Sequence, residues 1–122
     1  MKYEFDKKYT AGSSYSTTRI AAFTSGDDSS TRMILQSFVA STKQNLANLK
    51  LYHDRENHRM LSNVAHKMLP LFKSLEVNEL IPILELMEEK KLAPEEWNSK
   101  TLELIQKVEQ LIATIRKDYD IE

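Results

Sequence analysis

Hydrophobic residues recur at intervals of three and four along most of this chain, which is the spacing of one face of an α-helix. A first long stripe runs from about Asp28 to Tyr52. Its members are Ile34, Leu35, Phe38, Val39, Thr42, Leu46 and Leu49. The preceding "SGDDSS" offers N-cap candidates at Ser25, Asp27 and Asp28. The pattern predicts a long helix over about 28–52 and a short helix before it, over 17–24.

Three further stripes follow, separated by short polar breaks. A second helix is predicted from Arg55 or Glu56 to Leu75, and a third over 79–92 with Asn78 as its N-cap. Pro82 falls in the first turn of the third helix, where a missing N–H is tolerated. The last stripe predicts a fourth helix that ends near residue 119. Four amphipathic helices with short connections predict an all-α fold, an antiparallel (up-down) four-helix bundle with one short extra N-terminal helix.

Residues 1–16 differ from the rest of the chain. "AGSSYSTT" is rich in small and hydroxyl side chains and has no helical period. We therefore expect a leader or linker over 1–16, which could be an edge strand, an arm or disordered, and one helical domain over 17–119.

Composition and charge narrow the classes of function. The chain has 122 residues, no cysteine and a formal net charge of −1. That charge gives no electrostatic argument for nucleic acid, and the missing cysteines exclude disulfides and thiolate metal sites. No apolar run approaches the roughly 18 residues of a membrane span. We expect a cytoplasmic domain that is monomeric in isolation and neither inserts into a membrane nor binds nucleic acid.

His66 is the candidate for chemistry. On a helical wheel of residues 59–75, at about 100° per residue, the apolar side chains gather on one side and His66 falls roughly 160° from their centre. Its neighbours on the outward face are Arg59, Ser62, Leu69, Pro70 and Lys73. An apolar patch of Leu69 and Pro70 flanked by cations, beside a titratable ring, indicates a docking surface. His53 and His58 lie in a polar connector and are interpreted as plain surface residues.

At this point the sequence resembles a histidine-containing phosphotransfer (HPt) domain, the helical carrier of bacterial phosphorelays. The resemblance covers about residues 17–119. It includes Asp54 ahead of the Ala65–His66 pair, and it is otherwise carried by Phe23, Gly26, Asp27, Leu35, Phe38, Leu46, Leu49, Leu75, Leu80, Ile83, Met87 and Glu88. The family motif His-x-Leu-Lys-Gly reads His66-Lys67-Met68-Leu69-Pro70 here, and Glu76 stands where the family has a later glycine.

The resemblance implies a function and a set of partners. His66 would accept a phosphoryl group from the phospho-aspartate of a response-regulator receiver domain and pass it to another receiver. Mg²⁺ would come from the receiver, so no cofactor or metal of this chain's own is expected. The partners are receiver domains, free or linked to an upstream sensor histidine kinase.

The residues also indicate what chemistry is available. No Gly-rich phosphate loop is present, so we expect neither ATP binding nor autokinase activity. A neutral imidazole is a competent nucleophile without a general base. Because the motif lysine is replaced by Leu69, Arg59 and Lys73 are the candidates for contacting phosphate. Pro70 removes the N–H that would bond the His66 carbonyl, which predicts a bend or a missing hydrogen bond there.

Two other functions compete with an active carrier. The replaced lysine and glycine favour a degenerate relative that binds a receiver or kinase without carrying phosphate. A metal-binding helical bundle is disfavoured, because such sites use Glu-x-x-His ligands that face the core. This sequence has no Glu-x-x-His, and His66 is predicted to face outward.

Overall fold

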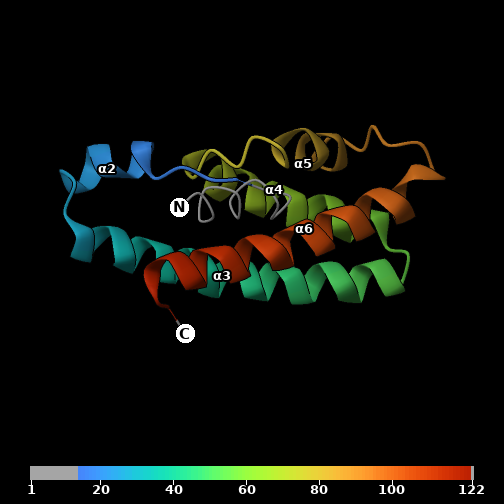
Figure 1. Ribbon diagram of the computed structural model, residues 1–122. Coiled ribbons are helices and arrows are strands. Elements are labelled where there is room, and N and C mark those ends of the chain that lie inside the picture. Colours follow the sequence, from blue (N-terminus) through green and yellow to red (C-terminus); the bar gives the residue numbers. More distant parts are fainter. Residues whose placement is uncertain (1–13, 122) are drawn as a thin grey trace, which may run out of the picture.

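The computed structural model describes residues 14–121, and in that part of the chain it contains five helices and no strand (Figure 1). The helices are α2 (Thr18–Thr24), α3 (Asp28–Asp54), α4 (His58–Ser74), α5 (Ile81–Glu88) and α6 (Glu96–Tyr119). The prediction of an all-α protein is confirmed. None of the described helices is both long enough and apolar enough to cross a membrane.

Side-chain caps fix the starts of α3 and α4. Asp27, one of the predicted candidates, caps α3: its Oδ2 accepts the N–H of Ser30 at 2.8 Å. Asn57 caps α4 by accepting the N–H of Met60 at 3.1 Å. Such caps satisfy backbone donors that have no partner inside the helix.

Helix α5 differs most from its prediction. It covers 81–88 instead of 79–92, and the residue at its N-cap is Leu80, without a side-chain cap, so the prediction of Asn78 was wrong. Pro82 does lie in its first turn. Lys90 takes a left-handed conformation with φ 56°, which ends the helix earlier than the apolar pattern suggests.

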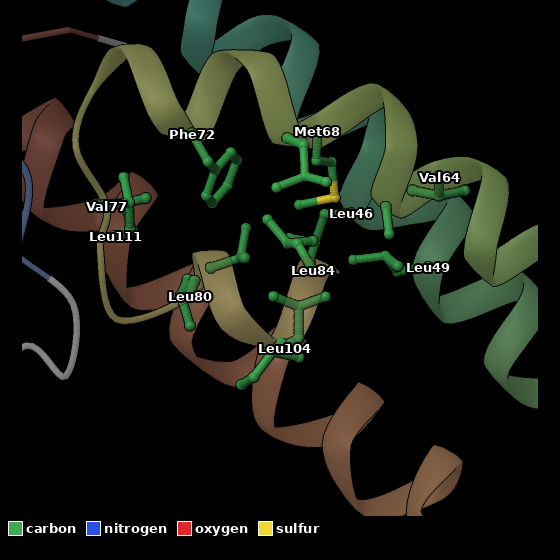
Figure 2. Close-up of a cluster of buried hydrophobic side chains, with 14 of the residues drawn as sticks. Leu46, Leu49, Val64, Met68, Phe72, Val77, Leu80, Leu84, Leu104 and Leu111 are labelled. Carbon is green, nitrogen blue, oxygen red and sulfur yellow. The ribbon is translucent and has the colours of Figure 1, made fainter. Parts of the chain in front are cut away.

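The helices meet around one hydrophobic core. Helix α4 packs against both α3 and α5, α3 packs against α6, and α2 lies on α3. Figure 2 shows side chains from α3, α4, α5, α6 and the connection between α4 and α5 pointing toward a common centre; those labelled are Leu46, Leu49, Val64, Met68, Phe72, Val77, Leu80, Leu84, Leu104 and Leu111. The ring centroids of Phe38 and Phe72 lie 5.3 Å apart. Burying each such side chain stabilises the fold by about 1.5–3 kcal/mol, so the core holds α4 firmly in place.

Part of the expected leader packs onto the helices. Residues 1–13 lie outside the described residues, whereas residues 14–16 are described and have no regular structure. The Tyr15 hydroxyl donates to Oδ2 of Asp118 at 2.6 Å, and the N–H of Ser16 donates to the Leu75 carbonyl at 2.8 Å. Burial and the neighbouring Asp118 carboxylate raise the pKa of the Tyr15 phenol. The end of the predicted leader is therefore held at the ends of α4 and α6.

Candidate functional site

His66 lies in the middle of α4 on its exposed face. Its neighbours Val64, Ala65 and Met68 are at most 3% exposed and fix the helix against the core. The His66 side chain is 73% exposed, as the helical wheel predicts. A rigid helix thus presents one imidazole to solvent.

A carboxylate from another helix orients this ring. Nδ1 of His66 forms a short hydrogen bond with Oε2 of Glu88, the last residue of α5. An ionised carboxylate only accepts, so the ring donates from Nδ1, and in the neutral ring the lone pair then lies on Nε2. Within residues 14–121 no side chain or backbone group hydrogen bonds to Nε2. The pair leaves one ring nitrogen open to an incoming group.

Ser62 and Leu69 were predicted beside His66 on the outward face, and for these two residues the prediction was wrong. Ser62 is 4% exposed and Leu69 is 5% exposed. The Ser62 hydroxyl donates to the Glu88 carbonyl at 2.9 Å, which places α5 over this flank of α4. A second helix covers the positions that the wheel of a single helix assigns to solvent. The exposed patch of Leu69 with Pro70 does not form.

Arg59, Pro70 and Lys73 remain on the exposed surface. Nζ of Lys73 lies 3.8 Å from Oε2 of Glu85 on α5, so Lys73 and His66 both reach across the seam between α4 and α5. Arg59 forms no ion pair with any residue of the described chain. Helix α4 continues through Pro70. Because proline has no N–H, the His66 carbonyl lacks its usual helical donor, which is the missing hydrogen bond that the sequence predicts.

An apolar hollow of about 480 Å³ lies between α2, α3 and the end of α4. Phe23 and Met33 at its rim are 86% and 65% exposed. Leu71 and Ser74 line it from α4. On a wheel of α4, Pro70 lies between His66 and Ser74, roughly 40° from each. The exposed face of α4 therefore leads from the imidazole across Pro70 to this hollow.

The other two histidines occupy a different environment. His58 is exposed, as the sequence predicts, whereas His53 is partly buried, so its interpretation as a plain surface residue was wrong. The His58 ring stacks on Trp97 with centroids 4.6 Å apart and an interplanar angle of 7°. Nε2 of His53 lies 2.6 Å from Oδ1 of Asn98, and its side chain is 18% exposed. Both rings join the turn between α3 and α4 to the start of α6. In the part of the chain that the structure describes, no group of three or more His, Asp or Glu side chains is placed to hold a metal ion.

Glu88 is the functional residue that reasoning from one helix missed. A search for carboxylates at helical spacing from His66 finds none, because the partner lies 22 positions away on α5. The sequence did carry a signal, since Glu88 is one of the residues on which the predicted resemblance to HPt domains rests. The pairing itself depends on how α4 and α5 pack.

Comparisons with known proteins add no relative. The chain matches no profile of a known protein family, no curated protein and no solved structure among those with which it was compared.

Proposed function

We propose that this chain is a phosphorelay carrier of the HPt type, with an antiparallel four-helix bundle of α3, α4, α5 and α6. His66 accepts a phosphoryl group from the phospho-aspartate of a receiver domain and passes it to the aspartate of another receiver. The observation that carries this proposal is the His66–Glu88 pair, an exposed imidazole with Nδ1 engaged and Nε2 open. The resemblance of residues 17–119 to HPt domains also supports it.

Contacts between helix ends support the proposed bundle. Arg32, near the start of α3, donates to the carbonyl of Asp120, just beyond α6, at 2.6 Å. His53, near the end of α3, lies against Asn98, near the start of α6. These contacts are those of two helices running in opposite directions. The short connections from α3 to α4 and from α4 to α5 suit the same up-down order.

The chemistry requires a single displacement at phosphorus. The Nε2 lone pair attacks the phosphorus of the receiver's acyl phosphate, the N–P bond forms, and the bond from phosphorus to the aspartate oxygen breaks. The aspartate leaves as a carboxylate, and the ring keeps its Nδ1 proton and gains positive charge. The Glu88 carboxylate at Nδ1 stabilises that charge, as the aspartate does in a Ser-His-Asp triad. The reverse reaction uses the same contacts, so the ring both accepts and donates.

The new phosphoryl group needs a cation, and Lys73 is the better candidate on this chain. Lys73 already lies on the seam that holds His66, and it is half-exposed with one ion pair to Glu85. A charge-assisted contact from its ammonium to the phosphoryl oxygens would contribute about 1.5–3 kcal/mol. Arg59 has no such link to α5. Mg²⁺ belongs to the receiver in this proposal, where it would neutralise charge on the transferring group.

A receiver domain docks over the exposed face of α4, in this proposal, and covers the apolar hollow. The hollow includes Ser74, two turns along α4 from His66. It exposes Phe23 and Met33, which are large apolar side chains of the kind that interfaces bury. Pro70 lies between the hollow and the imidazole. Docking there would bring the receiver's aspartate to Nε2 and would exclude water from both.

The experiment is phosphotransfer from receiver domains of the source organism. Each receiver is phosphorylated with a small-molecule phosphodonor and incubated with the chain or with its His66→Gln variant. We expect acid-labile phosphate to appear on the chain and not on the variant, while the helical circular-dichroism signal stays the same. Label on the variant, or unfolding of the variant, would contradict the proposal.

A second candidate is a degenerate HPt-like domain that binds a receiver or kinase without carrying phosphate. The observation that favours it is Leu69: the position of the motif lysine holds an apolar side chain that is buried under α5. The same assay separates the two candidates, because a receiver that binds the chain tightly but leaves no label on it supports the second. In either case we propose a cytoplasmic domain that is monomeric alone and is free or linked to an upstream kinase.

A further inference from the structure

Ser62 forms an unusual hydrogen bond for a serine inside a helix. A helical serine commonly donates to the carbonyl four residues earlier, as Ser74 does to Pro70 at 3.0 Å. The buried Ser62 hydroxyl instead crosses to α5 and donates to the carbonyl of Glu88 at 2.9 Å. Ser62 precedes His66 by four residues, so both side chains face α5 one turn apart.

The carbonyl that Ser62 reaches belongs to the last turn of α5. The final carbonyls of a helix have no partner within it. Three of those in α5 are taken by backbone N–H groups beyond its end: Glu85 accepts from Glu89, Leu86 from Lys91 and Met87 from Lys90. The Glu88 carbonyl accepts from Ser62. The serine therefore completes the end of α5 from a neighbouring helix.

Glu88 is thus bound to α4 at two points. Its backbone carbonyl accepts from Ser62, and its carboxylate accepts from Nδ1 of His66. The carboxylate is only about one-third exposed, and the imidazole that it orients is mostly exposed. The exposed His66 ring can rotate about its side-chain bonds. Glu88 holds it in one orientation only if Glu88 is itself held in place. The hydroxyl provides that fixed point.

We propose that Ser62 is a positioning residue for His66: by fixing the end of α5 it keeps Glu88 at Nδ1 and the lone pair on Nε2. This inference rests on the proposed function, in which Nε2 receives the phosphoryl group. It is separate from the role of Glu88 itself, because Ser62 touches neither the ring nor the incoming phosphate.

The test measures the protonation of the His66 ring directly in the ¹⁵N-labelled chain. Two-bond ¹H–¹⁵N spectra of the neutral ring report which nitrogen carries the proton. We expect the Nδ1–H form to dominate in the wild type and the two forms to mix in Ser62→Ala. Ser62→Thr keeps a hydroxyl and should restore the wild-type ratio. The control Ser99→Ala removes a hydroxyl that bonds within α6 at 3.3 Å and should change nothing.

The initial rate of phosphate transfer from a receiver gives the second readout. Loss of one neutral hydrogen bond that orients the site should slow Ser62→Ala by roughly three- to tenfold, with Ser62→Thr close to wild type. If Ser62→Ala does not fold, Ser62→Cys takes its place, because the longer C–S bond and weak S–H donor of cysteine do not reproduce the hydrogen bond of the hydroxyl.

An unchanged proton distribution in a folded Ser62→Ala or Ser62→Cys variant would overturn the inference, whatever the transfer rates are. A wild-type chain that takes no phosphate would overturn the proposed function, and the ring spectra would still decide the role of Ser62. A shifted proton distribution together with slower transfer would support both.

Discussion

His58 and His66 lie on the same helix, about 12 Å apart along its axis, and their surroundings differ completely. The ring of His58 lies flat on Trp97, at the junction of the α3–α4 turn with α6. The ring of His66 extends into solvent and meets one carboxylate through one nitrogen. The contrast shows that exposure alone does not make a histidine available to react. The face of the His58 ring is covered by Trp97, whereas the His66 ring is held at Nδ1 and presents Nε2 to solvent.

The same substitution at both histidines should separate chemistry from structure, with the largest effect at His66. His66→Gln should abolish phosphate acceptance and leave the free energy of unfolding within about 0.5 kcal/mol of wild type, because the side chain is exposed. Transfer assays and chemical denaturation measure the two quantities. A large loss of stability would mean that the ring is part of the packed structure.

Pro70 is expected to cost stability. Pro70→Ala restores an N–H opposite the His66 carbonyl, so the variant should be more stable by about 2 kcal/mol, measured by urea denaturation. If Pro70 also contacts the receiver, the variant should bind the phosphorylated receiver more weakly, measured by calorimetry. Higher stability with unchanged affinity and transfer rate would remove Pro70 from the docking surface.

Glu88 should matter through both its position and its charge. Glu88→Ala removes the partner of Nδ1 and should slow transfer about tenfold, the equivalent of about 1.4 kcal/mol. Glu88→Gln keeps an acceptor without the charge, so its rate should fall between those of Glu88→Ala and wild type. Equal rates for all three proteins would show that the carboxylate does not assist transfer.

At His58 the expected effect is smaller, and it falls on stability instead of on phosphate transfer. His58→Gln removes the stack on Trp97 and should lower the free energy of unfolding by about 1 kcal/mol, followed by urea denaturation with Trp97 fluorescence. Transfer to His66 should be unchanged. Loss of transfer in a folded variant would contradict the division of roles between the two histidines.

The smallest effect concerns acid sensitivity, to which the helix cap at Asp27 should contribute. Hydrogen bonds from the side chain and backbone N–H of Ser30 lower the pKa of Asp27. A lowered pKa in the folded state contributes stability above the ordinary aspartate value of about 3.9, and this contribution is lost as the pH falls through the lowered pKa. Asp27→Asn keeps a capping side chain, so it should melt slightly lower than wild type at pH 7. Melting curves of the two proteins should converge as the pH falls through the lowered pKa of Asp27.

The sequence was sufficient for those features that depend on one helix at a time. The apolar stripe of 28–52 matches α3 within two residues at its end, and Asp27 could be identified as a cap from its position. The outward direction of His66 also follows from a single wheel. Features that depend on two helices could not be read this way: Ser62 and Leu69 are buried because α5 covers them, and Glu88 meets His66 because α5 ends beside it. The early end of α5 depends on the left-handed backbone of Lys90. Glycine is the residue that usually indicates such a conformation in a sequence, and here the position holds a lysine.

In the proposed carrier, Glu88 holds Nδ1 of His66 and Nε2 reacts. This division between the two nitrogens is decided by ³¹P and ¹⁵N NMR of the ¹⁵N-labelled chain after incubation with a phosphorylated receiver. We expect a single phosphoramidate, bonded to Nε2 of His66. A phosphoryl group on Nδ1 or on another residue, or none from any receiver of the organism, would contradict it.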